Sequence, residues 1–102
     1  MEKFTLYLGL NDKDTKTQKI GTIEAYKVVE NLIAKDFGGG TIYEARGVYR
    51  HESGQIVTEN TLRIELLFTT LEAVKELVAT LKRAFNQESI AVQRENICSE
   101  LM

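Results

Sequence analysis

Apolar and polar residues alternate along two stretches of the chain, and this period of two is typical of strands with one buried face. The first stretch covers residues 4–10, with apolar positions Phe4, Leu6, Leu8 and Leu10. The second covers residues 61–68, with apolar positions Leu62, Ile64, Leu66 and Phe68. Because each stretch places its apolar side chains on a single face, both are predicted to pack that face against a hydrophobic core.

Apolar residues recur at helical spacing in two other stretches. Over residues 22–36 they predict a helix that begins with Thr22 as its N-cap and is stopped by the three glycines at positions 38–40. Over residues 70–86 Thr69 and Glu72 have the spacing of a capping box, which predicts the start of a second helix. Its apolar stripe consists of Val74, Leu77, Val78, Leu81 and Phe85.

Two further strands complete the pattern. Residues 41–50 are rich in β-formers, but apolar side chains occur on both faces of this segment, so its inward face stays open. Tyr43, Ala45 and Tyr49 share one face, and Ile42 and Val48 share the other. Residues 52–55 resemble a hairpin turn that leads into the next strand. A last strand is predicted from Ile90 to Ile97 or Cys98.

The predicted order is strand, helix, strand, strand, helix, strand. Two such halves pack most simply as a ferredoxin-like α+β domain, in which a four-stranded antiparallel sheet carries both helices on one face. Right-handed crossovers then place the first and third strands in the centre, which agrees with their regular alternation. With 102 residues and neither a linker nor a repeat, the chain is expected to be a single domain over residues 1–102.

Composition excludes several kinds of chemistry. A single cysteine, Cys98, allows no internal disulfide or cysteine zinc site, and a single histidine, His51, allows no poly-histidine metal cluster. No cofactor or metal is therefore expected. No apolar run approaches the ~20 residues of a membrane-spanning helix, and the first residues lack a signal-peptide core, so a cytoplasmic protein is expected. Its net charge of -2 argues against nucleic-acid binding.

The sheet face that the helices leave open is the predicted functional surface. Alternation places Tyr7, Arg63 and Glu65 on this face, opposite the apolar positions of their strands. Arg46 or Tyr49 would join them from the neighbouring strand. The predicted binding residues are therefore Tyr7, Arg46, Tyr49, Arg63 and Glu65, with aromatic packing by the tyrosines and directional charge pairing by the arginines.

Three interpretations of this face remain open. Arg63 and Glu65 could simply pair with neighbouring strands and have no further role. The face could instead meet another copy of the chain in a sheet-to-sheet homodimer. An aromatic residue beside an arginine could also stack RNA bases, but the central strands lack the glycine-aromatic motif of RNA-recognition domains, which argues against this third interpretation.

The loop at residues 11–19 contains the beginning of a calcium-loop pattern. Asp12 and Asp14 have the right spacing, but Thr17 and Ile23 stand where an EF-hand requires glycine and glutamate. A solvated loop is therefore preferred over a metal site. The loop is nevertheless long for a connection between a strand and a helix, which keeps it as a candidate contact region.

No pair of polar residues defines a catalytic site. His51 and Glu52 are sequence neighbours near a strand end, and adjacent strand residues point to opposite faces. Glu59 and Glu65 are an even number of positions apart and share a strand face, but two carboxylates alone do not define an acid–base pair. The protein is therefore not expected to be an enzyme.

Three segments resemble known proteins: Tyr7-Leu8-Gly9-Leu10 with its polar loop, residues 43–49 with Arg46-Gly47, and Thr61-Leu62-Arg63-Ile64-Glu65. They resemble small uncharacterised proteins encoded by phages and mobile elements of Gram-positive bacteria. They are also distantly similar to a bacterial domain family of unknown function. Coding by a phage would imply a small binding protein that blocks a host defence system. The fold plan also resembles PII-like and ACT regulatory domains, which bind small ligands between subunits.

Three functional hypotheses follow. The first is a non-catalytic binding or regulatory protein, homodimeric and encoded by a phage, whose open sheet face binds a host protein. The second is a small-ligand sensor that binds a nucleotide or metabolite at a subunit boundary near residues 11–19. The third is a small enzyme that uses the open face, which would require a concave pocket with convergent polar groups.

Overall fold

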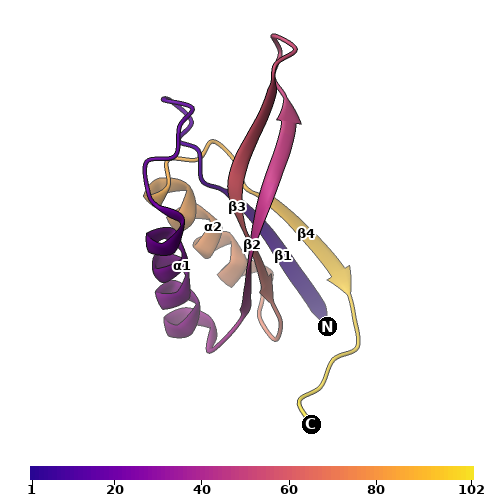
Figure 1. The fold of residues 1–102 in the computed structure, drawn as a ribbon. Coiled ribbons are helices and arrows are strands. Elements are labelled where there is room, and N and C mark those ends of the chain that lie inside the picture. Colours follow the sequence, from indigo (N-terminus) through magenta and orange to yellow (C-terminus); the bar gives the residue numbers. More distant parts are fainter.

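In the computed structural model, which describes all residues 1–102, the chain forms four strands and two helices (Figure 1). The elements are β1 (Glu2–Gly9), α1 (Thr22–Phe37), β2 (Thr41–Arg50), β3 (Ile56–Leu66), α2 (Leu71–Ala84) and β4 (Ala91–Asn96). Their order is the βαββαβ order that was predicted from the sequence. Neither helix combines the length and hydropathy that crossing a membrane would require.

The strands pair in the order β2-β3-β1-β4, and all neighbouring pairs are antiparallel. β1 and β3 are therefore central, as their regular alternation predicted. Both helices lie on one side of the sheet and leave the other side uncovered (Figure 1). The structure confirms the ferredoxin-like α+β fold with a four-stranded antiparallel sheet.

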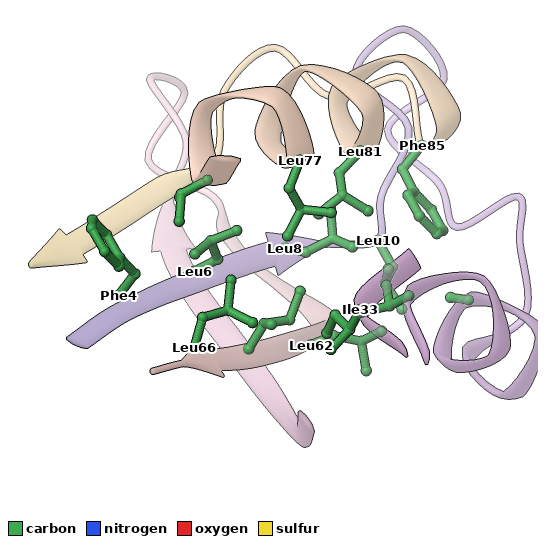
Figure 2. Close-up of a cluster of buried hydrophobic side chains, with 14 residues drawn as sticks. Phe4, Leu6, Leu8, Leu10, Ile33, Leu62, Leu66, Leu77, Leu81 and Phe85 are labelled. Atoms are coloured by element: carbon green, nitrogen blue, oxygen red, sulfur yellow. The ribbon is translucent and has the colours of Figure 1, made fainter. Parts of the chain in front are cut away.

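The hydrophobic core lies between the sheet and the two helices, and Figure 2 shows the leucines of β1 and β3 on the same side of the sheet as those of α2. Its buried sheet residues include Phe4, Leu6, Leu8, Leu62, Ile64 and Leu66, and its helical residues are Ala25, Val29, Ile33, Val74, Leu77 and Leu81. Full burial of one such large side chain contributes roughly 1.5–3 kcal/mol. This hydrophobic term holds the helices on the sheet.

The first helix begins at Thr22, the start of the predicted range, but Thr22 is not its N-cap as predicted. Gly21 is its N-cap, and Thr22 is its first helical residue. The Thr22 hydroxyl instead accepts a hydrogen bond from Nε2 of Gln18 at 3.0 Å. It therefore bonds the preceding loop and does not cap the helix. The predicted end is confirmed, because Gly38 adopts the left-handed conformation that stops a helix, with φ of 71°.

The second helix is capped by a different threonine from the one predicted. The Thr70 hydroxyl accepts a hydrogen bond from the backbone amide of Ala73 at 3.2 Å. Because α2 begins at Leu71, Thr69 lies one residue too early to cap it. The capping box predicted from Thr69 and Glu72 is therefore wrong by one position.

Two predictions about strand faces need correction or completion. Ile42 on β2 packs against the core, so Tyr43 points to the open face, a choice that the sequence pattern had left open. Phe68 does not continue the apolar face of β3, which ends at Leu66. Its backbone is left-handed, with φ of 55°, and its side chain is exposed. A residue in this conformation turns the chain out of the strand before α2 begins. The last strand also ends earlier than predicted, at Asn96.

The hairpin of β2 and β3 extends beyond the rest of the sheet (Figure 1). β1 pairs with β3 only as far as Thr61, whereas β2 remains paired with β3 up to the turn. We call residues 46–60 the hairpin arm. Two of its apolar residues are largely exposed: Val48 has an exposed fraction of 67% and Ile56 of 56%. No third strand pairs with β3 beyond Thr61, and a two-stranded ribbon is only marginally stable alone.

Candidate functional site

Arg63 lies between two tyrosines in the middle of the open sheet face. Tyr7 on β1 and Tyr43 on β2 are both directly opposite Arg63 in the strand register. The guanidinium carbon is 6.0 Å from the centre of the Tyr7 ring and 5.3 Å from that of Tyr43. A cation–π contact contributes roughly 0.5–1 kcal/mol at an exposed position. We call these three residues, with Glu65, the Arg63 platform.

Glu65 balances the positive charge of the platform. Its Oε2 lies 2.8 Å from Nη2 of Arg63 and 3.3 Å from Nζ of Lys3. Its Oε1 accepts a hydrogen bond from the Tyr43 hydroxyl at 3.2 Å. One carboxylate on β3 thereby joins side chains from β1, β2 and β3. This is the pairing with neighbouring strands that was one of the three interpretations of the face.

Two polar atoms in the same layer are buried without a hydrogen-bond partner. They are the hydroxyl of Thr5 and Nε of Arg63. Thr5 is fully buried although its register neighbours are Glu65 and Gln93, which belong to the open side of the sheet. A buried polar group without a partner costs about 1–3 kcal/mol. The open face therefore combines aromatic surface with unpaired polar atoms.

The structure brings together only part of the predicted binding surface. Tyr7, Arg63 and Glu65 belong to the platform, whereas Tyr49 shares their face but lies out on the hairpin arm. Arg46 lies on the opposite face, where its Nη2 donates to the Thr58 hydroxyl at 3.4 Å. Arg46 and Tyr49 are an odd number of positions apart, and alternate residues of a strand point to opposite sides. They cannot both belong to the open face.

A second polar site lies where the hairpin arm leaves the sheet. The Glu59 side chain on β3 lies between two glycines, Gly9 on β1 and Gly47 on β2. A Cβ atom on Gly9 would be 2.5 Å from Oε1 of Glu59, and one on Gly47 would be 3.5 Å from its Cγ. Oε2 of Glu59 accepts a hydrogen bond from the backbone amide of Asn11 at 3.0 Å. The absence of a side chain at Gly9 gives the carboxylate its space, whereas a Cβ on Gly47 would make an ordinary van der Waals contact with Glu59.

A hollow of about 310 Å³ opens beside this carboxylate, and we call it the Glu59 hollow. It adjoins a second hollow of about 420 Å³ that follows the hairpin arm, and Asn11, Lys16 and Tyr49 line both. Gln87, after α2, closes another side of the first hollow. The loop at residues 11–19, which was expected to be a contact region, thus contributes four residues to the lining of the Glu59 hollow, namely Asn11, Asp12, Lys13 and Lys16.

Asp12 organises this loop. Its Oδ1 accepts hydrogen bonds from the amides of Asp14 at 2.8 Å and Thr15 at 3.0 Å, and its Oδ2 accepts one from the Asn86 side chain at 3.0 Å. These bonds, of which that from Thr15 has the largest effect, lower the pKa of Asp12 from 3.8 to about 2. Asp12 is therefore ionised at neutral pH and forms an Asx turn. No group of three His, Cys, Asp or Glu side chains in the protein could hold a metal ion.

Sequence reasoning missed several members of both sites. The sequence pattern pairs Glu59 only with Glu65, and the predicted binding residues do not include Tyr43. Gly9 and Gly47 offered a signal for the second site, since glycine inside a strand often marks a close approach of another group. Only the strand register, however, places Gly47 opposite Glu59 and Gly9 opposite Thr61, two residues further along the same face of β3.

A hollow of about 670 Å³ lies at the opposite end of the sheet. Its lining is mainly apolar and includes Phe37, Leu67, Phe68 and Leu101. Its charged members, Lys3 and Glu65, are already paired with each other. Its other polar side chains are the Thr41 hydroxyl and the Cys98 thiol, and its size alone does not make it the functional site.

Comparisons with known proteins identify a family and several similar structures. The chain belongs to the family described as protein of unknown function (DUF3574), which matches residues 3–101. A phage SAM lyase in complex with S-methyl-5'-thioadenosine is 30% identical, with a TM-score of 0.65 over 92% of this chain and 79% of that chain. The phage SAM lyase in the apo state is 23% identical, with a TM-score of 0.56 over 92% and 78%. No curated protein matches the chain.

The CutA protein of Pyrococcus horikoshii, in a crystal structure determined in the presence of 3 M guanidine hydrochloride, is 20% identical. Its TM-score is 0.59 over 99% of this chain and 88% of that chain. At this level of identity the likeness concerns the fold alone. The match to DUF3574 confirms the predicted resemblance to a domain family of unknown function. Coding by a phage stays a prediction.

Proposed function

We propose that the protein binds S-adenosylmethionine (SAM) in the Glu59 hollow and cleaves it as a SAM lyase. The observation that carries this proposal is the 30% identity, over 92% of the chain, with a phage SAM lyase in complex with S-methyl-5'-thioadenosine. A carboxylate in a glycine-flanked hollow supplies a polar group for such a ligand. This is the small-enzyme hypothesis, with the site moved from the Arg63 platform to the base of the hairpin arm.

The groups around the Glu59 hollow match the parts of this ligand. Glu59 uses Oε2 to accept the Asn11 amide, which leaves Oε1 for the ribose hydroxyls, the groups that acidic residues bind in dinucleotide sites. The Tyr49 ring offers a face for the adenine base or for the sulfonium cation. Lys16 supplies a positive charge that would bind and orient the carboxylate of the ligand, and because this carboxylate loses its charge in the reaction, the contact favours binding and not the chemical step. Glu59, Tyr49 and Lys16 would therefore contact the sugar, the base and the amino-acid end of the ligand, respectively.

The ribose is a better partner for Glu59 than the sulfonium would be. Cleavage converts the positive sulfonium into a neutral thioether, so a carboxylate in contact with it would stabilise the substrate more than the transition state. The ribose hydroxyls keep their hydrogen-bonding character throughout the reaction. Contact with them adds to binding without opposing the chemical step, and it is shared by the substrate and by S-methyl-5'-thioadenosine.

The proposed step needs no external reactant. An oxygen of the substrate's own carboxylate attacks the γ-carbon, and this C–O bond forms while the bond from the γ-carbon to sulfur breaks. Both electrons of the C–S bond pass to sulfur, and no proton is transferred. The products are neutral S-methyl-5'-thioadenosine and a four-carbon lactone that keeps the ammonium group. Catalysis would come from holding the carboxylate in line with the C–S bond and from excluding water while opposite charges neutralise each other.

We also propose that copies of the chain meet through the open sheet face. The Arg63 platform exposes the rings of Tyr7 and Tyr43 and contains a buried Nε atom without a partner, and the nearby Thr5 hydroxyl is unpaired as well. Aromatic surface with unpaired polar atoms is characteristic of a face that is covered in an assembly. A homodimer, as the sequence predicted, is the simplest such assembly. A host protein on the same face remains the alternative partner.

The proposed activity is tested by incubating the purified protein with SAM and measuring S-methyl-5'-thioadenosine by liquid chromatography. A protein-free sample is needed because sulfonium compounds also decompose without a protein. Binding of S-methyl-5'-thioadenosine is measured in parallel by titration calorimetry. Glu59→Gln is expected to weaken this binding about tenfold through loss of a charge-assisted hydrogen bond. Glu44→Gln, on the opposite face of the sheet, is the matched control.

The outcomes separate the three functional hypotheses. Product formation above the protein-free rate, reduced by Glu59→Gln but not by Glu44→Gln, supports the lyase. Binding of S-methyl-5'-thioadenosine without cleavage of SAM supports the small-ligand sensor instead. If the protein neither binds nor cleaves, the proposal is wrong, and the non-catalytic protein that binds a partner through its open face is the hypothesis left.

A further inference from the structure

The side chain of Asn86, which follows α2, joins the two carboxylates of the loop at residues 11–19. Its Nδ2 donates to Oδ2 of Asp12 at 3.0 Å and to Oδ2 of Asp14 at 2.8 Å. Its backbone carbonyl accepts a hydrogen bond from the amide of Lys13 at 3.1 Å. Three consecutive loop residues are therefore bonded to a single residue that is more than seventy positions away in the sequence.

The backbone of Asn86 is suited to this contact. Its φ is 47°, in the left-handed region that asparagine occupies more readily than most residues. The preceding residue, Phe85, is the C-cap of α2 and is buried in the core. The contact is therefore anchored on a rigid element, whereas the loop that it holds has no helix or strand of its own apart from the single bridge between Asn11 and Gln18.

Gln87 extends the same arrangement to Asn11. Its Nε2 donates to the Asn11 carbonyl at 2.7 Å, while the amide of Asn11 donates to Glu59 at 3.0 Å. Both polar backbone groups of Asn11 are thus engaged, one by the segment after α2 and one by the carboxylate in the hollow. The orientation of the Asn11 amide, and with it the position of Glu59, depends on how the loop is held.

We propose that Asn86 is a positioning residue of the Glu59 hollow: by bonding Asp12 and Asp14 it fixes the loop that directs the Asn11 amide at Glu59 and that places Lys16 at the hollow. The residue acts through the loop and does not touch the ligand. The part of the inference that concerns ligand binding rests on the proposed function, whereas the part that concerns the order of the loop does not. Since Asp12 is ionised at neutral pH, the bond from Asn86 is charge-assisted under working conditions.

The variant Asn86→Gly isolates this side chain. Glycine accepts the left-handed φ and keeps the backbone carbonyl that bonds Lys13, so only the two side-chain bonds are lost. Asn86→Asp is a second variant, which keeps the size of the side chain but places a third carboxylate beside Asp12 and Asp14. Thr80→Ala is the matched control, because it removes one side-chain hydrogen bond from α2 that is not connected to the loop.

Two readouts are measured on each variant. Hydrogen exchange of the Asp14 and Thr15 amides, which both bond Asp12, is expected to accelerate at least about tenfold in Asn86→Gly. Affinity for S-methyl-5'-thioadenosine, or KM for SAM, is expected to worsen about tenfold with little change in kcat, because the loop positions binding groups. Asn86→Asp should show the same changes more strongly, and Thr80→Ala should match the wild type in both readouts.

The two readouts separate this inference from the proposed function. Unchanged amide exchange in Asn86→Gly and Asn86→Asp overturns the inference whatever the ligand data show. Faster exchange with unaltered ligand affinity also overturns it, since the loop would then not position the site. If the wild type binds no adenosyl ligand at all, the proposed function fails, and the exchange data alone decide whether Asn86 orders the loop.

Discussion

A Cβ atom on Gly9 would lie 2.5 Å from Oε1 of Glu59. Atoms at this distance overlap, so the carboxylate can occupy its place over β1 only because residue 9 has no side chain. Glu59 belongs to β3 and Gly9 to β1, and the register pairs Gly9 with Thr61, which is two residues from Glu59 on the same face of β3. Gly39, in the connection after α1, differs in this respect, since it has no atom within 4 Å of its Cβ position.

Gly9→Ala is therefore expected to displace the Glu59 side chain while the fold is retained. Affinity for S-methyl-5'-thioadenosine should fall about tenfold, because the carboxylate no longer lies where the ligand's hydroxyls bind it. Titration calorimetry measures the affinity, and far-UV circular dichroism checks the fold. Gly39→Ala is the control and should bind like the wild type. Equal affinities in the two variants would show that the site is elsewhere.

The Arg63 platform should determine the assembly state. Tyr7→Ala and Arg63→Ala remove the aromatic and charged parts of the surface through which copies are proposed to meet, so both should shift the protein toward the monomer. Sedimentation velocity at micromolar concentration gives the mass of the species. Ile23→Ala removes an exposed apolar side chain from α1 and should leave the assembly unchanged. A wild type that is strictly monomeric would contradict the proposed interface.

The core of β1 should be sensitive to truncation. Leu8 is completely buried between the sheet and the helices. Leu8→Ala is expected to lower the free energy of unfolding by about 2–5 kcal/mol, because it removes buried methyl groups and leaves a cavity. Urea unfolding at a fixed protein concentration measures the change. Leu101→Ala, at a position that is 89% exposed, should change it by less than about 0.5 kcal/mol; a comparable loss in both variants would contradict the assigned core.

Asp12 should make stability depend on pH at the acid end. Its pKa is about 2 in the folded protein, whereas the ordinary value of 3.8 applies to the unfolded chain. The stabilising contribution of its hydrogen bonds is therefore present above about pH 4 and is lost as the pH falls toward about 2. Thermal unfolding across this range should show Asp12→Asn to be less stable than the wild type at neutral pH.

The difference between the two should shrink as the solution is acidified, because the wild type then also carries an uncharged side chain at position 12. Asp36→Asn, at an exposed position on α1, serves as the control and should not show this narrowing difference. A constant difference between Asp12→Asn and the wild type over the whole range would mean that ionisation of Asp12 does not contribute to stability.

The order of the elements, and the face that most of them pack against the core, could be predicted from the sequence. This is because side-chain periodicity is a local property of each element. The alternation from Phe4 to Leu8 continues into the structure unchanged, and the stripe of Val74, Leu77 and Leu81 on α2 is buried as its spacing requires. Burial of these faces is the dominant stabilising term, so a pattern that exposes one consistent apolar face leaves little choice of arrangement.

The ends of the helices and strands were predicted less accurately than their order, because a single residue near an end can form more than one contact or conformation. Thr22 is chemically able to cap α1, yet its hydroxyl is used by Gln18. Phe68 has the spacing of an inward residue, yet the chain turns away at that point. Each choice depends on a contact or a turn that is formed by residues outside the local pattern, with free energies of roughly 1 kcal/mol or less between the alternatives.

Tyr7, Arg63 and Glu65 could be placed on one face from strand alternation, since residues at even spacing point to the same side. The local pattern thus accounts for the fold plan, the central strands and three members of the open face. The tertiary structure alone decided that Tyr43 completes the Arg63 platform, that Arg46 lies on the other face, and that Glu59 has space between two glycines. These facts depend on the register between strands and on hydrogen bonds from the segment after α2, and both join residues that are far apart along the chain.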